Sequence, residues 1–179
     1  MNTRKLLKNR LALSTVVTTL IILVVSVLLA GVVTYYAINV TSTRVSEESL
    51  QLEFLHVWYA PTGSPQTEAA FVIINTGGRD VVLQKITIRG QPVSWGATVT
   101  TSVSASGTPA SDPAYATSLP GTATSAAPTL PSGDSMTVYI SGPDSISIND
   151  IGLTVSVTVF TSQAMYYEEA NVQTTQSAA

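Results

Sequence analysis

Few side chains in this sequence are of a kind that does chemistry, and their spacing builds no catalytic site. The one histidine, His56, lies among apolar residues in a segment with strand-like alternation, which favours a structural role over that of a base or a ligand. The adjacent carboxylates of Glu47-Glu48 and Glu168-Glu169 diverge on a helix and point to opposite faces of a strand. Residues 144–150 offer oxygen ligands without the alternating carboxylates of a calcium loop.

Composition narrows the possible functions further. The chain has no cysteine, which excludes disulfides, thiolate metal sites and thiol nucleophiles. It also has no Gly-rich phosphate loop, GxSxG elbow or HExxH sequence. We therefore predict that the protein is not an enzyme and uses no catalytic residue, cofactor or metal. Four of the eight Lys and Arg residues precede residue 12, so the rest of the chain is acidic and poorly suited to binding nucleic acid.

The element that must organise the chain is the apolar stretch Leu11 to Thr43, which contains no charged residue. As a helix it would reach roughly 50 Å at about 1.5 Å per residue, beyond the ~30 Å hydrocarbon core of a bilayer. A secretory signal peptide would need an apolar stretch of only about 7 to 15 residues. A membrane anchor fits better, with the basic flank of Arg4, Lys5, Lys8 and Arg10 in the cytoplasm and the rest of the chain outside.

The junction KNRLALSTVV joins basic residues to a small residue and then to the apolar stretch. It resembles the class III signal of archaeal type IV pilins and archaellins, in which a prepilin peptidase cuts before the apolar helix and leaves that helix in place. The resemblance implies a cut between Ala12 and Leu13. Bacterial pilins usually carry Glu at mature position five, where this chain has Val17, so the archaeal branch is the better match.

Helical periodicity gives a second argument, independent of the resemblance. At 100° per residue, six small or hydroxyl residues fall on one face of the helix, a group that we call the small-residue stripe: Thr15, Thr19, Ser26, Ala30, Thr34 and Ala37. Such stripes let apolar helices approach closely. The alternative is that the hydroxyls simply bond to carbonyls one turn earlier. Gly31 is a possible bend or melted turn, and Asn39 begins a glycosylation sequon that is usable only outside a packed core.

Beyond this helix, expected to end near Glu48 to Leu50, the pattern turns to short strands separated by Gly and Pro turns. The strands are expected at 50–59, 68–75, 80–89, 93–103, 135–140, 152–161 and 164–172. Residues 104–131 are rich in Ser, Thr, Ala and Pro. They predict either an exposed low-complexity loop that carries O-glycans or an ordered excursion packed around Tyr115 and Leu119.

The predicted fold is α+β, with one long N-terminal hydrophobic α-helix followed by an antiparallel immunoglobulin-like β-sandwich. The order of the head motifs, including the Asn-Thr-Gly-Gly turn, resembles the heads of archaeal pilins and archaellins. The expected parts are a leader at 1–12, the helix at 13–49, and a head at 50–179 that includes the 104–131 loop.

The resemblance implies a major pilin, the structural subunit of an archaeal type IV pilus that serves surface adhesion. Its partners would be further copies of itself in a helical filament, the prepilin peptidase with the assembly machinery, and the cytoplasmic membrane before assembly. The mature protein would then lie at the cell surface. Two alternatives stay open: a monomeric, membrane-anchored surface protein whose β-sandwich binds a ligand, and an archaellum subunit that serves motility.

Overall fold

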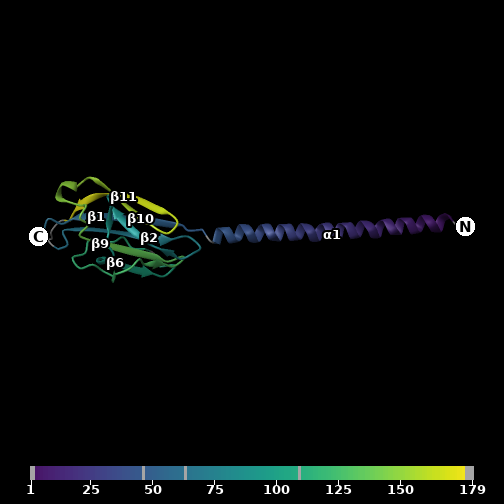
Figure 1. Ribbon diagram of the computed structural model, residues 1–179, viewed down its shortest axis with the longest axis horizontal. Helices are drawn as coiled ribbons and strands as arrows, with labels where there is room; N and C mark the ends of the chain where they lie inside the picture. Colours follow the sequence, from purple (N-terminus) through teal and green to yellow (C-terminus); the bar gives the residue numbers. More distant parts are fainter. Residues whose placement is uncertain (1–2, 46, 63, 109, 176–179) are drawn as a thin grey trace. The chain divides into compact units, whose positions relative to one another are not determined.

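The computed structural model describes residues 3–45, 47–62, 64–108 and 110–175, and the chain divides into two compact units between residues 44 and 45. The first unit is a single helix, α1 (Thr3–Val45, 43 residues; Figure 1). It runs without interruption through Gly31, where the sequence allowed a bend or a melted turn. The apolar stretch therefore folds as one continuous helix.

The second unit, which we call the head, consists of strands. Nine of them form one sheet in the order β5-β4-β10-β11-β1-β2-β9-β6-β7, and β3 pairs with β8. Their bounds are β1 Leu50–Tyr59, β2 Thr67–Asn75, β3 Val81–Val82, β4 Lys85–Ile88, β5 Gln91–Val93, β6 Gly96–Ser104, β7 Thr122–Thr124, β8 Thr129–Leu130, β9 Ser135–Ser141, β10 Thr154–Phe160 and β11 Met165–Thr174, with a short 3-10 helix, η1, at Ile148–Asp150.

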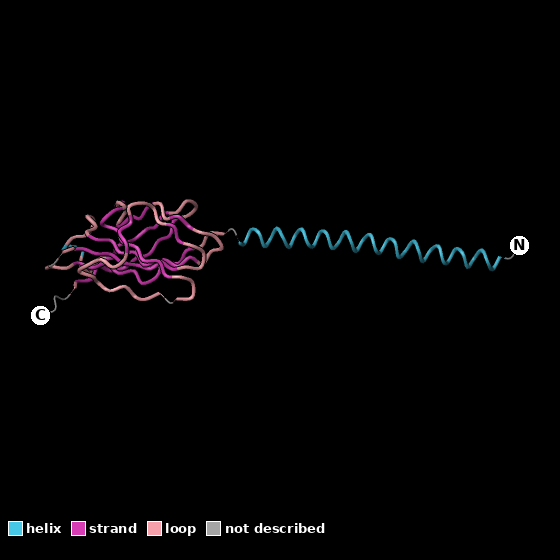
Figure 2. The backbone as a smooth tube through the Cα atoms, turned by 90° about the horizontal axis from the view of Figure 1, so that it is seen from below, coloured by secondary structure: helices cyan, strands magenta, loops and turns pink. Residues whose placement is uncertain are grey.

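The sheet curls so that its two halves enclose one core (Figure 1). Phe71 and Ile73 of β2 and Val138 of β9 belong to the same buried cluster as Ile86 of β4 and Val157 of β10. The halves join at β1 and β11, which run parallel with Val57 opposite Val172, and Figure 2 shows the strands gathered around this core. The predicted α+β layout is thus confirmed, with the sandwich formed by one curled, mostly antiparallel sheet.

In β1 the simple alternation predicted from the sequence breaks at a β-bulge. Its register with β2 shifts between Glu53 and His56, and Phe54 takes a left-handed backbone with φ of 54°. Leu55 and Val57 therefore enter the core, whereas strict alternation would place Phe54, His56 and Trp58 on the same face as Leu50. A bulge inserts one residue and so reverses which side chains face inward.

The strand expected at 80–89 is wrong as a single element. It divides into β3, which pairs with β8, and β4, which pairs with β10 and β5. Val81, Leu83, Ile86 and Ile88 are all buried, so the alternation changes phase at Gln84 and Lys85. The chain crosses there from one pairing partner to another, and both parts keep their apolar side chains in the core. The strand expected at 93–103 corresponds to β6 at 96–104, and Val93 instead ends the separate strand β5.

The helix ends earlier than the sequence predicted, because residues 47 and 49 form hydrogen bonds within the head. The carbonyl of Ser49 accepts hydrogen bonds from the backbone N–H groups of Thr76 and Gly77, and the carbonyl of Glu47 accepts one from Gly78. These carbonyls hold the chain against the turn at residues 76–78. They fix the start of β1 at Leu50, where helix was expected to continue to 48–50.

Replacing Gly77 with Ala is expected to destabilise the head by about 1–3 kcal/mol, the usual cost of overpacking a tight contact. A Cβ atom there would lie 2.7 Å from both Glu47 O and Ser49 N, and both are backbone atoms that cannot rotate away. Thermal unfolding followed by circular dichroism measures the effect. Arg79→Ala in the same turn removes an exposed side chain and is the control; equal midpoints for the two variants would contradict the close approach.

The described part of the 104–131 segment is an ordered excursion, the second of the two interpretations left open by its composition. It contributes β7 and β8 to the sheets. Tyr115, Ala116 and Leu119 pack against a small cluster of Trp58, Ala70 and Tyr139, which is separate from the main core. Trp58 and Tyr115 meet edge to face, with ring centroids 6.1 Å apart. The segment therefore covers the outer surface of β1, β2 and β9.

Candidate assembly helix and the buried carboxylates of the head

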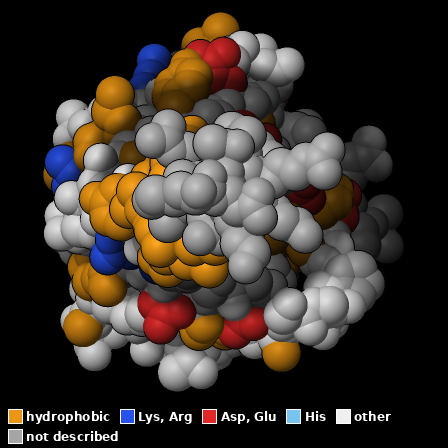
Figure 3. Space-filling model, turned by 90° about the vertical axis from the view of Figure 1, so that its right-hand side faces the viewer, with side chains coloured by type: hydrophobic (Ala, Val, Ile, Leu, Met, Phe, Trp, Pro, Cys, Tyr) orange, Lys and Arg blue, Asp and Glu red, His pale blue; other side chains and the backbone are white. Residues whose placement is uncertain are grey.

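The largest uncovered apolar surface in the described structure is that of α1. Its stretch Ser14–Ser42 has 29 residues, none of them buried, and an 18-residue window within it reaches a mean hydropathy of 2.9, so the stretch is long and apolar enough to cross a membrane. Leu23, Leu28 and Val32 each expose more than half of their surface. In the space-filling view of Figure 3, hydrophobic side chains, coloured orange, also lie at the surface. Apolar surface on this scale needs a cover of lipid or protein, because exposing it to water is costly.

The small-residue stripe lies along this exposed helix. Thr19 Oγ1 donates to Val16 O at 2.9 Å, Ser26 Oγ to Ile22 O at 2.6 Å, and Thr34 Oγ1 to Ala30 O at 2.8 Å. These hydroxyl protons are thus satisfied inside the helix, as the alternative interpretation expected. The same bonds leave the stripe able to face an apolar neighbour without an unpaired donor. Its role in helix packing stays a prediction.

The remaining sequence-predicted sites also belong to α1. The backbone of Ala12 and Leu13 is helical, but the side chains at the expected cleavage point lie outside the described residues. Asn39, the glycosylation candidate, lies in the exposed part of the helix. The structure thus places the expected processing, packing and modification sites along one element without bringing them together.

His56 contacts both its own strand and the 104–131 excursion. Its ring stacks on Trp58 with centroids 5.2 Å apart and an interplanar angle of 13°. Its Nε2 lies 2.8 Å from Asp112 Oδ1. The partner of His56 comes from the 104–131 excursion, 56 residues farther along the chain. The contact between His56 and Asp112 holds that excursion against β1.

Glu68 is the functional candidate that sequence reasoning missed. It begins an apolar strand segment, where an acidic residue is expected at a solvated strand end, yet it is fully buried. Its Oε1 accepts a hydrogen bond from the Ala116 N–H at 3.1 Å, and its Oε2 has no hydrogen-bond partner. Burial raises the pKa of Glu68 to about 7, against a smaller lowering by the Ala116 amide. The residues that cover Glu68, such as Ala116, are distant in sequence, so the strand's own sequence does not indicate this environment.

A second carboxylate, Glu168 on β11, also has a buried oxygen, Oε2, without a hydrogen-bond partner. Its pKa is raised by burial and by the carboxylate of Glu53 on the neighbouring strand β1. Glu169 beside it is exposed and bonds to Tyr167, so the two adjacent acids point to opposite faces of β11. The side chain of Glu168 is half-buried, so its environment is less closed than that of Glu68.

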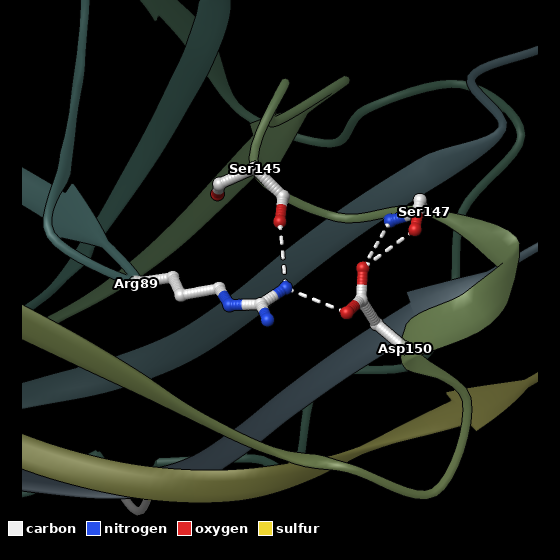
Figure 4. Close-up of polar contacts among 4 residues, drawn as sticks. All are labelled: Arg89, Ser145, Ser147 and Asp150. Atoms are coloured by element: carbon white, nitrogen blue, oxygen red, sulfur yellow. Dashed lines mark hydrogen bonds and ion pairs between the residues drawn. The ribbon is translucent and has the colours of Figure 1, made fainter.

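The oxygen-rich stretch 144–150 forms contacts within the head. Asp150 Oδ1 accepts a hydrogen bond from Arg89 Nη1 at 2.6 Å, and Oδ2 accepts from the N–H and Oγ of Ser147 (Figure 4). The Ser147 bonds, followed by Arg89, lower the pKa of Asp150. Both carboxylate oxygens are thus engaged by protein donors. Within residues 3–45, 47–62, 64–108 and 110–175, no group of three or more His, Cys, Asp or Glu could hold a metal ion.

Comparison with known proteins leaves the family of this chain unassigned. No protein-family model matches it, and no curated protein matches it. Among solved structures, it is similar to a subunit of the Iho670 flagellar-like filament, at 14% sequence identity and a TM-score of 0.35. That alignment covers 88% of this chain and 98% of the other. At this TM-score the likeness carries no argument about function, which must come from the helix and the head themselves.

Proposed function

We propose that this chain is the structural subunit of an extracellular filament, in which α1 packs with the α1 helices of other copies and the acidic head forms the outer surface. This proposal rests on the uncovered apolar stretch Ser14–Ser42. At about 1.5 Å per residue it spans roughly 44 Å, longer than the ~30 Å of a bilayer core. A helix bundle in a filament sets no such limit on length.

The proposed assembly step transfers the helix from lipid to a bundle of like helices. Both environments are apolar, so the transfer has little hydrophobic cost and close packing decides the balance. The hydroxyl protons of Thr19, Ser26 and Thr34 are already bonded to helix carbonyls, so they need no new partner in either environment. Removal of the basic leader before Leu13 would spare the core four unpaired cations.

Within this proposal, the junction at Ala12 and Leu13 and the Val at position 17 favour a major pilin of an archaeal type IV pilus that serves adhesion. Of the two alternatives, an archaellum subunit is nearer to this proposal, because it too is a filament subunit. The proposed partners are other copies of the chain, the prepilin peptidase with its assembly machinery, and the cytoplasmic membrane before assembly. We propose no enzymatic activity. The exposed hydroxyls of residues 117, 118 and 122 are the proposed glycan positions on the excursion.

The second candidate is a monomeric surface protein anchored by α1, which the membrane-compatible length of Ser14–Ser42 also allows if the helix tilts. Shearing cells and probing both fractions for the chain separates the two functions. Recovery in sheared extracellular filaments is expected, and recovery in membranes alone would contradict the filament. In a deletion strain, loss of surface attachment with intact swimming supports the pilus, and loss of swimming supports the archaellum.

Replacing Thr19 with Trp is expected to lower filament yield about tenfold or more, because an indole on the stripe prevents close helix approach and overpacking costs about 1–3 kcal/mol. Ile21→Trp, on the opposite face of the helix, is the matched control and should assemble better. Filaments are quantified by electron microscopy, and circular dichroism checks that the head stays folded. Equal yields from both variants would contradict the packing role of the stripe.

A further inference from the structure

The segment Asp112–Leu119, which we call the covering segment, is held against the outer face of the sheet by three polar contacts. Asp112 pairs with His56, with 2.8 Å between Oδ1 and Nε2. The Tyr115 hydroxyl donates to Pro65 O at 2.9 Å. The Ala116 N–H donates to Glu68 Oε1 at 3.1 Å. Two of these three contacts therefore involve a carboxylate.

Glu68 lies at the centre of this arrangement and is enclosed by it. Its side chain is fully buried, and Oε2 has no hydrogen-bond partner. Across the sheet, Glu68 stands opposite Trp58 of β1 and Ser141 of β9. The titratable groups that interact with it are the phenols of Tyr115 and Tyr139. Neither of these phenols supplies a positive charge, so a desolvated Glu68 carboxylate would be compensated only in part, by the Ala116 N–H.

Two further polar groups lie at the edge of the covering segment. Asp112 also faces Tyr139, and its ion-pair partner is His56. Acid thus favours the protonated Glu68 carboxyl under the segment.

We propose that the covering segment is a pH-responsive clasp, closed over a protonated Glu68 in acid and loosened when Glu68 ionises. This inference concerns the head alone and holds whether or not the chain forms filaments. Loosening would expose the aromatic cluster of Trp58, Tyr115 and Tyr139. The clasp therefore links the pH of the medium to the apolar surface that the head presents.

The direction of the pH dependence follows from proton linkage. With the segment closed, burial raises the pKa of Glu68 from 4.5 to about 7. When the segment lifts, water reaches the carboxyl and its pKa falls back toward the usual value. The stabilisation of the closed state is complete below the usual value and is lost as the pH rises toward 7. Burial raises the pKa of both tyrosines above their usual value, so these phenols stay neutral throughout this range.

Hydrogen exchange on the full chain in detergent micelles tests the clasp. The protection factor of the 112–119 amides, corrected for intrinsic exchange, is expected to fall roughly tenfold to a hundredfold between pH 5 and 8.5. Amides of Phe71 and Ile73 in β2 serve as the internal reference and should change less. A constant protection factor for residues 112–119 would overturn the proposal.

Glu68→Gln keeps the shape and the acceptor for the Ala116 N–H but does not titrate. It is expected to abolish most of the pH dependence, while Asp144→Asn, at an exposed position, should keep it. A Glu68→Gln chain that retains the full decline overturns the proposal. If that variant does not fold, carbon-13 NMR of the wild-type Glu68 carboxyl decides: a midpoint near 7 supports the clasp, and one near 4.5 overturns it.

Discussion

Cells that express an Ala12→Asp variant are expected to accumulate uncut protein in the membrane, with mature protein and filaments reduced at least about tenfold. A loss of about 1.4 kcal/mol in transition-state binding is sufficient for a tenfold slower cut, and a charge at the scissile bond in place of a small residue would cost more than this. This expectation rests on the likeness of the KNRLALSTVV junction to a class III signal. N-terminal mass analysis of membrane and filament fractions measures the cut.

The uncut chain should stay out of filaments because of its charges. Arg4, Lys5, Lys8 and Arg10 would enter a helix bundle whose facing surface, residues 11–43, contains no acidic partner. Burying unpaired charges is prohibitive, whereas in the membrane these side chains remain in the cytoplasm. Ala12→Ser, which keeps a small residue, is the control and should be cut normally. Filaments built from uncut Ala12→Asp chains would refute the proposed leader.

The elements that were predictable from sequence are those that local pattern alone determines. The uncharged stretch from Leu11 could only be a helix, and α1 spans it. Val155, Val157 and Val159 alternate strictly and fill the core from β10. In both cases the residues carry their own periodicity, and no distant partner is needed to interpret it.

The failures occur where a distant partner sets the local geometry. The bulge at Phe54 depends on the register of β1 against β2, and the phase change at Gln84 depends on the switch from β8 to β10 as partner. Glu68 resembles an ordinary strand end until residues 112–119 cover it. Such features follow from pairing across the sheet, which one strand's own sequence does not contain.

Replacing Phe71 with Ala is expected to lower the free energy of unfolding of the head by about 3–5 kcal/mol, the usual cost of emptying a buried aromatic site. Phe71 is fully buried in the middle of β2, opposite Val138 of β9, and belongs to the cluster that joins both halves of the sheet. Because a domain is typically stable by only about 5–15 kcal/mol, this one change would remove much of the margin.

Chemical denaturation followed by circular dichroism measures the loss, with Phe54→Ala as the matched control. Phe54 is 40% exposed at the bulge, so its truncation should cost less than about 1–2 kcal/mol. Because α1 and the head are separate compact units, the Phe71 variant should keep its helical signal while the strand signal melts early. Equal losses from the two phenylalanines would mean that the core enclosed by the curled sheet does not hold the head together.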